Sequence, residues 1–316
     1  MARMKLQQLR YLVEVERRGL SVSAAAEALF TSQPGVSKQI GLLEEELGVT
    51  IFERSSKRLT GITAPGRIVL AMARRMLSEA QNMKRVGEDY ATESSGMLSI
   101  ATTHTQARYT LPPVIQHFVQ LHPAIRLHIQ QGSPLQVAEW VRDGSADLGI
   151  ATEALDRHPE LLTLPCFQWA HLVVTPKQHP LLAHQPLTLA ALAEYPLITY
   201  DATFTGRSRI DRAFERQSLR PNVMLTAIDS DVIKTYVGLG LGVGIIAEMA
   251  FDPLRDEGLA AMPAGHLFEG NTTRMGLRRD IWLRGYEYDF IALLAPQLNR
   301  RMVEATLKGE GADPGL

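Results

Sequence analysis

Apolar residues recur at helical spacing through the first third of the chain. Residues 5–18 predict an amphipathic first helix, which Gly19 ends. The small residues of SAAAEAL favour a second, short helix, with Ser23 as a residue able to cap it. Pro34 lacks an N–H and is tolerated only in the first turn of a helix, so a third helix is expected to begin near Ser32.

The third helix has one apolar and one polar face. Its apolar positions recur at spacings of four, three and four residues, which indicates one buried face. A short helix, a turn and a helix with an exposed polar face are typical of a DNA-reading helix-turn-helix, whose second helix enters the major groove. There Gln can pair with adenine, and Ser or Lys can reach base edges or phosphates. The expected DNA-contacting residues of this helix are Ser32, Gln33, Ser37 and Lys38.

The segment VTIFERSSKRLTGIT that follows has two short apolar runs around a polar tip, the pattern of a β-hairpin wing. Arg54, Lys57 and Arg58 are then expected to meet DNA phosphates, which fixes register without reading sequence. A solvated basic loop is the alternative. Charge supports the wing, because residues 1–90 carry a basic excess while the remainder of the chain is acidic.

A long helix is expected to follow the wing. Thr63 can cap it, Pro65 fits its first turn, and the helical pattern continues to about Tyr90. A lone helix of this length cannot bury its own apolar face, so we expect it to pair with the same helix of a second subunit. A surface helix lying on its own domain is the alternative. The polar stretch at 92–96 is the expected hinge.

Several motifs of the first third resemble the winged helix-turn-helix of LysR-type transcriptional regulators. They are LQQLRYLVEV, SAAAEAL, TSQPGVSKQIGLLEEELGVTIFERS and LTGITAPG. Later segments resemble the CysB subgroup, activators of cysteine biosynthesis and sulfur assimilation: IATTHTQARYTLPPVI, HIQQGSP, GIATEAL, LPCFQW, FTGRS, DSDVIKTYVGLGLGVGIIAEMAFDPL and YEYDFI. The resemblance covers nearly the whole chain.

Beyond Gly96 the pattern changes to alternating strands and helices. The expected strands predict an α/β fold with a mainly parallel sheet; they are 97–101, 125–129, 146–151, 171–174, 196–200 and 223–227, with a further strand after VGLGLGVGII. The resemblance implies a two-lobed effector domain like that of periplasmic binding proteins, with two crossings between the lobes. The expected domains are an all-α winged helix-turn-helix (1–62), a dimerisation linker helix (63–91), a hinge (92–96), an α/β effector domain (97–308; lobe I 97–164 and 269–300, lobe II 165–268) and a flexible tail (309–316).

Hydroxyl side chains follow three of the expected strands. In open α/β sheets ligands bind beyond the carboxyl ends of strands, where backbone N–H groups are free. Neutral hydroxyls and amides there suit a small oxyanion, although a single threonine at a strand end is more often only a helix cap. By resemblance, the effector-binding role falls on Thr103, Thr105, Gln106, Thr152 and Thr205. The resemblance also implies N-acetylserine or O-acetylserine as inducer, with sulfate or thiosulfate as competing anions.

Composition limits the other functions. A 45% hydrophobic and 21% charged chain can form a substantial core, and it has no apolar run long enough to span a bilayer and no signal-peptide pattern. We therefore expect a cytoplasmic protein rather than a solute-binding transport component. Cys166 is the single cysteine, so no internal disulfide is possible, and we expect it in the core. No metal-spaced cluster, paired carboxylates or Ser/His/Asp pattern predicts an enzyme, a metal site or a cofactor.

The favoured hypothesis is thus a DNA-binding transcriptional regulator of sulfur-assimilation genes, mainly an activator. Its expected partners are promoter DNA, a small anionic effector, RNA polymerase and further copies of itself, with a tetramer implied by the resemblance. A regulator of sulfonate use that responds to adenosine phosphosulfate resembles the sequence almost as well. The sequence leaves that choice, the operator and the target genes open.

Overall fold

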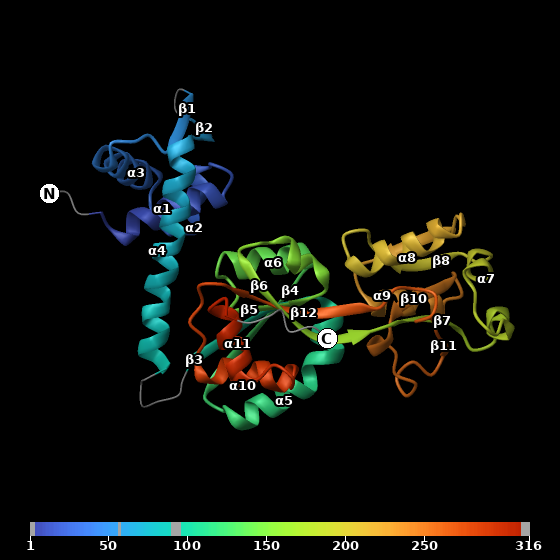
Figure 1. The fold of residues 1–316 in the computed structure, drawn as a ribbon. Helices are drawn as coiled ribbons and strands as arrows, with labels where there is room; N and C mark the ends of the chain where they lie inside the picture. Colours follow the sequence, from blue (N-terminus) through green and yellow to red (C-terminus); the bar gives the residue numbers. More distant parts are fainter. Residues whose placement is uncertain (1–3, 56–57, 90–95, 311–316) are drawn as a thin grey trace. The chain divides into compact units, whose positions relative to one another are not determined.

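The computed structural model describes residues 4–55, 58–89 and 96–310, with side chains except at positions 88, 89, 153, 154 and 205 (Figure 1). The chain divides into two compact units. The first comprises residues up to 90 together with Asp280–Trp282, and the second comprises the remainder. None of the helices within the described ranges combines the length and the hydropathy needed to cross a membrane.

Three helices form the core of the first unit: α1 (Leu6–Arg17), α2 (Val22–Ala28) and α3 (Gln33–Leu47). Their inward positions are apolar and form one buried cluster that includes Leu12 and Ile40. The cap of α2 is Ser21, whose Oγ accepts a hydrogen bond from the backbone N–H of Ala24 at 3.2 Å. The expectation that Ser23 caps this helix is therefore wrong. The helix begins at Val22, so Ser23 lies inside its first turn.

The turn before α3 follows from two residues. Ser32 caps the helix by accepting from the backbone N–H of Gly35 at 3.3 Å, and Pro34 lies in the first turn. At the other end Gly48 has a φ of 68°, a conformation that a residue without Cβ adopts at no steric cost. These two signals fix the length of α3, and its buried residues Val36, Ile40 and Leu43 lie along one face.

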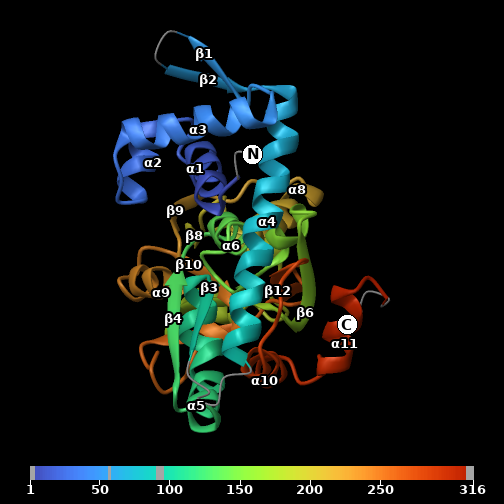
Figure 2. The same ribbon diagram turned by 90° about the vertical axis from the view of Figure 1, so that its left-hand side faces the viewer.

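A wing and a long helix complete the first unit. Strands β1 (Phe52–Ser55) and β2 (Arg58–Ile62) pair antiparallel as a hairpin. Thr63 Oγ1 accepts from the backbone N–H of Gly66 at 2.9 Å and so caps α4 (Ala64–Asp89). Figure 2 shows the hairpin and α3 near one end of α4. Large apolar side chains remain exposed along α4, namely Ile68, Met72, Met76 and Met83.

The second unit contains two five-stranded sheets, one in each lobe (Figure 1). The sheet of lobe I has the order β4 (Ile125–Gln131), β3 (Gly96–Thr102), β5 (Leu148–Ala151), β12 (Asn271–Arg278) and β6 (Leu161–Trp169). Its helices are α5 (Leu111–Leu121), α6 (Pro134–Arg142), α10 (Gly285–Leu294) and α11 (Arg300–Leu307).

Lobe II is built from the continuous segment between β6 and β12. Its sheet has the order β11 (Leu259–Pro263), β7 (His171–Pro176), β10 (Val243–Ala247), β8 (Leu197–Tyr200) and β9 (Val223–Ala227). Its helices are α7 (Leu189–Ala193), α8 (Thr205–Arg216) and α9 (Ser230–Gly238). The chain passes from β6 to β7 through Ala170 alone, so the first crossing between lobes lies a few residues beyond the expected boundary at 164/165.

The expectation of a mainly parallel sheet is wrong. In lobe I, β3 is parallel to β4 and β5, but β12 runs antiparallel to both β5 and β6. In lobe II, β8 is parallel to β9 and β10, whereas β7 is antiparallel to β10 and β11. The strands that carry the chain between the lobes enter each sheet without the helical crossover that parallel neighbours require, and this produces the mixed topology.

Candidate functional site

The four polar residues expected to contact DNA lie at the first turns of α3. Ser32, Gln33 and Lys38 are exposed and Ser37 is half-buried. Gln33 Nε2 donates to Ser37 Oγ at 3.4 Å, which holds the Gln33 amide over the helix. Phe30, in the turn before α3, is 98% exposed and has a φ of 50°. Phe30 is not among the residues expected from the sequence to contact DNA.

The wing residues have different environments. Arg54 is half-exposed and its Nη2 lies 2.6 Å from Glu44 Oε2. The other oxygen of that carboxylate accepts from the backbone N–H groups of Ile51 and Phe52, so Glu44 ties the wing to α3. Arg58 is exposed, and Lys57 lies outside the described residues. The Glu44 carboxylate therefore orients Arg54, one of the wing's basic residues.

A small cavity lies between the two lobes of the second unit. Its volume is about 40 Å³. Lobe I and the end of β6 contribute Thr103, Thr105, Gln106, Thr152 and Trp169, and lobe II contributes Tyr200, Phe204, Gly206 and Ala247. Four of the five residues expected to bind the effector thus meet here. The fifth, Thr205, has its backbone between two lining residues, and its side chain lies outside the described residues.

Strand ends position these residues. Thr103 follows β3, Thr152 follows β5, and Phe204 follows β8, so the cavity lies at the carboxyl ends of parallel strands in both sheets. After β3 the chain forms a π-helical turn, η1 (Gln106–Thr110), before α5. Such turns are rare in proteins overall, and those that occur are often found at functional sites.

A buried hydrogen-bond cluster backs the cavity. Gln106 Nε2 and Trp169 Nε1 both donate to Thr273 Oγ1, each at 3.1 Å. Gln106 Oε1 is buried and has no hydrogen-bond partner among the described residues. Turning the amide over would let the Thr273 hydroxyl donate to Oε1 while still accepting from Trp169, and would free Nε2 to donate.

The donors that line the cavity are uncharged. Tyr200 Oη lies 2.7 Å from Ser230 Oγ and accepts from the backbone N–H of Ala247 at 2.9 Å. Burial raises the pKa of Tyr200, so its hydroxyl is neutral. The nearby Arg207 instead pairs with Asp211 at 2.7 Å and donates to the carbonyl of Tyr200. Neutral hydroxyls and amides can bind a small oxyanion without a buried cation.

His171 lies behind the same cavity. A Cβ added to Gly206 would come 3.2 Å from His171 Nε2, so only a residue without a side chain leaves this contact unstrained. Burial lowers the pKa of His171 to about 4, and the ring is therefore neutral at physiological pH. Cys166 in β6 is also buried, as expected, and burial raises the pKa of its thiol to about 12. Neither group supplies charge to the cavity.

Comparison with protein families identifies both parts of the chain. Residues 6–67 match the bacterial regulatory helix-turn-helix protein of the lysR family, and residues 91–299 match the LysR substrate binding domain. The chain is 54% identical over 307 residues to the transcriptional regulator CysB of Burkholderia cenocepacia, covering 97% of this chain and 98% of that protein. It is 53% identical over 305 residues to SsuR of the same organism, covering 96% and 99%.

Solved structures of LysR-type regulators are also similar to this chain. The cofactor-binding domain of the Cbl transcriptional regulator superposes with a TM-score of 0.66 at 46% identity, covering 68% of this chain and 94% of that domain. Full-length CbnR in complex with its target DNA has a TM-score of 0.57 at 20% identity, covering 92% and 99%, and shares the fold. The close relatives are transcriptional regulators, which confirms the expectation that the protein is not an enzyme.

Proposed function

The chain belongs to the LysR family of transcriptional regulators, and from that premise we propose that it regulates genes of cysteine biosynthesis and sulfur assimilation, mainly as an activator. Its effector would be a small anion bound between the lobes. Its place of action would be the cytoplasm, where it meets promoter DNA and RNA polymerase. The relatives named CysB, Cbl and SsuR support this assignment.

The observation that carries the effector proposal is the small cavity lined by neutral donors. A cavity of about 40 Å³ has room for a few water molecules, since one needs on the order of 10–15 Å³ by the same measure. Sulfate or thiosulfate suits that space and its hydroxyl donors. N-acetylserine and O-acetylserine are longer, so their binding would require the lobes to separate. The binding roles are assigned to Thr103, Thr105, Gln106, Thr152 and Thr205.

Effector binding would then act through the arrangement of the lobes. A ligand shifts a conformational equilibrium only if it binds one state better than the other. The proposed dimer contact is the apolar stripe of α4, whose exposed side chains Met72 and Met76 need a partner of the same kind. Two subunits so paired would present two recognition helices, and a pair of dimers would form the tetramer. Lobe movement would change the spacing of these helices and the bend imposed on DNA.

Base reading is assigned to Gln33, Ser32 and Ser37, and phosphate contact to Lys38 and to the wing residues Arg54, Lys57 and Arg58. Fluorescence anisotropy with a sulfur-gene promoter fragment tests this division. Gln33→Ala should weaken specific binding by about 1–3 kcal/mol and relax sequence preference, whereas Lys38→Ala should weaken binding to all sequences and reduce the salt slope by about 1. Gln7→Ala, exposed on α1, is the matched control. Equal loss of binding to all sequences in both variants would contradict the division of roles.

The sulfonate-use branch remains the second candidate, because identity to SsuR and to CysB is nearly equal. Isothermal titration of the full chain with N-acetylserine, O-acetylserine, sulfate, thiosulfate and adenosine phosphosulfate separates the two. Preference for acetylserine or sulfate supports the cysteine regulon, and preference for adenosine phosphosulfate supports the sulfonate branch. Thr103→Ala should weaken the binding, while the exposed Thr226→Ala should not. Saturable binding that Thr103→Ala leaves unchanged would contradict the assigned site.

A further inference from the structure

A second set of polar contacts joins the lobes beside the effector cavity. Arg108 and Tyr109 belong to η1 of lobe I, and Asp231 belongs to the first turn of α9 in lobe II. Arg108 Nε lies 2.7 Å from Asp231 Oδ2, and Tyr109 Oη donates to Asp231 Oδ1 at 2.5 Å. One carboxylate of lobe II therefore binds two neighbouring side chains of lobe I.

Lys234 extends these contacts into lobe II. It is buried, and its Nζ donates to Tyr109 Oη at 3.0 Å and to the carbonyl of Ala250 at 2.8 Å. Asp256 Oδ1 lies 2.9 Å from the same nitrogen. Burial lowers the pKa of Lys234, but the hydrogen bonds to Tyr109 and Asp256 outweigh it and leave the pKa above its ordinary value. The ammonium is therefore charged, and its hydrogen bond to Tyr109 is charge-assisted.

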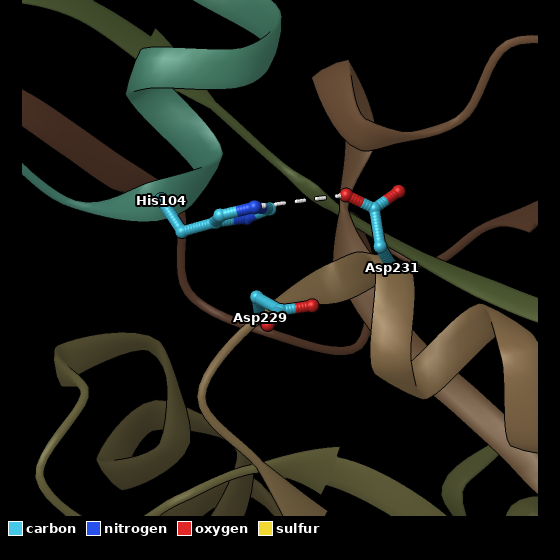
Figure 3. Close-up of side chains that lie close together, drawn as sticks. All are labelled: His104, Asp229 and Asp231. Atoms are coloured by element: carbon cyan, nitrogen blue, oxygen red, sulfur yellow. Dashed lines mark ion pairs between the residues drawn. The ribbon is translucent and has the colours of Figure 1, made fainter. Parts of the chain in front are cut away.

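Figure 3 shows two further residues at the same place, with His104 of lobe I pointing towards Asp229 and Asp231 of lobe II. His104 Nε2 lies 3.9 Å from Asp231 Oδ2. The three side chains have the atom types of a metal site, yet Arg108 already places a positive charge against Asp231. A guanidinium in that position opposes a divalent cation, so the geometry favours ion pairing between the lobes over metal binding.

We propose that Arg108, Tyr109, Asp231 and Lys234 form a lobe latch, which holds the lobes in the closed arrangement and so sets effector affinity without touching the effector. The effect of the latch on effector affinity rests on the proposed effector role of the cavity. The latch itself rests on the contacts between η1 and α9. In this assignment Tyr109 is a positioning residue, because its hydroxyl contacts both Asp231 and Lys234 across the lobe boundary.

The latch and the cavity share the same two segments of chain. In lobe I, Gln106 lines the cavity and the latch residues follow two and three positions later. In lobe II, Ser230 bonds the cavity residue Tyr200, and the latch residue Asp231 is next in sequence. Separation of the lobes would therefore break the latch and open the cavity together. An effector that bridges the lobes stabilises the same state as the latch, and the two must reinforce each other.

Two substitutions test the latch in the full-length chain. Tyr109→Phe keeps the ring and removes the hydroxyl, and Asp231→Asn keeps the shape and removes the charge. Each should speed amide hydrogen exchange in segments 104–110 and 229–234, and weaken sulfate binding by about tenfold, the equivalent of one charge-assisted hydrogen bond. Because the two residues share the Tyr109–Asp231 hydrogen bond, the loss in the double variant should be smaller than the sum of the two single losses.

The control is Glu304→Gln, which breaks the exposed Arg300–Glu304 pair within α11 of lobe I. It should change neither exchange in the two segments nor sulfate affinity. Unchanged exchange in Tyr109→Phe would overturn the latch, and so would additive losses in the double variant. If the native chain binds no sulfate, the proposed effector role of sulfate fails, and exchange alone then decides the latch: faster exchange in Tyr109→Phe supports it and unchanged exchange overturns it.

Discussion

Replacing Thr273 by valine tests whether the cluster behind the cavity stabilises the second unit. Thr273 is fully buried in β12, and valine matches its shape without the hydroxyl. The change removes the acceptor of two buried donors, the Gln106 amide and the Trp169 indole. Thr273→Ser keeps the hydroxyl and removes only the methyl group, so the two variants separate hydrogen bonding from packing.

The expected loss can be worked out from the two donors. A buried donor left without an acceptor costs about 1–3 kcal/mol. Gln106 lines the cavity, where a water molecule can accept its N–H, and its cost is reduced accordingly. The indole of Trp169 has a rigid ring and a single donor, so it carries most of the loss. We expect Thr273→Val to lower the free energy of unfolding by about 2 kcal/mol and Thr273→Ser by about 1 kcal/mol, the latter for one buried methyl group.

Urea unfolding of the full chain, followed by tryptophan fluorescence, measures both variants. The midpoint of the transition assigned to the second unit should fall while its slope stays constant, because a change in slope would report altered surface exposure instead. Sulfate affinity should fall in Thr273→Val and persist in Thr273→Ser, since only the hydroxyl orients Gln106. A serine variant as destabilised as the valine variant would refute the reasoning, because packing alone would then account for the loss.

Three further outcomes are expected. Burial lowers the pKa of His171 to about 4, so below pH 6.5 the unfolded chain takes up a proton that the folded chain does not. Stability should therefore fall between pH 6.5 and 4 by up to about 3 kcal/mol in urea titrations, and His171→Gln should abolish that part of the slope; an equal slope in both chains would contradict it. Gly66→Ala would place a Cβ 2.1 Å from the carbonyl oxygen of Ile51 and should destabilise the first unit by about 1–3 kcal/mol in thermal melts, whereas Gly87→Ala, which meets open space, should not. Ser133→Ala removes the cap of α6 and should lower the free energy of unfolding in urea by about 1 kcal/mol. Ser133→Asn keeps a capping side chain and should retain most of that stability, and equal stability of the two variants would refute the cap's contribution.

The helices of the first unit were predictable because single residues set their ends. Gly19, Pro34 and Gly48 each favour a backbone conformation that begins or ends a helix. The spacing of the apolar residues between them then indicates which face of each helix is buried. The charge pattern predicted a basic wing, but it did not predict that Glu44 of α3 binds the wing. Glu44 and Arg54 are ten positions apart on different elements, and only the turn between them brings the two side chains together.

The second unit was harder to predict where the chain passes between lobes. No strand was expected at 161–169, yet β6 lies there and includes Pro165, which β6 tolerates as an edge strand with a bulge opposite Thr273 and Arg274. Three threonines that follow strands, Thr103, Thr105 and Thr152, line one cavity, and their binding role stays a prediction. The latch gave no sequence signal, since Tyr109 and Asp231 are far apart along the chain and meet only through the arrangement of the lobes.

The position of lobe II between β6 and β12 also governs how the chain can fold as it is synthesised. Trp169 and Asn271 are paired neighbours in the sheet of lobe I, although about a hundred residues separate them. Until β12 leaves the ribosome, β5 has an unpaired edge and β6 has no neighbour in its sheet. Lobe II is continuous, and its folding brings the two ends of that long loop together at little further entropic cost. Lobe I therefore starts to fold before lobe II and completes its sheet only after lobe II has folded.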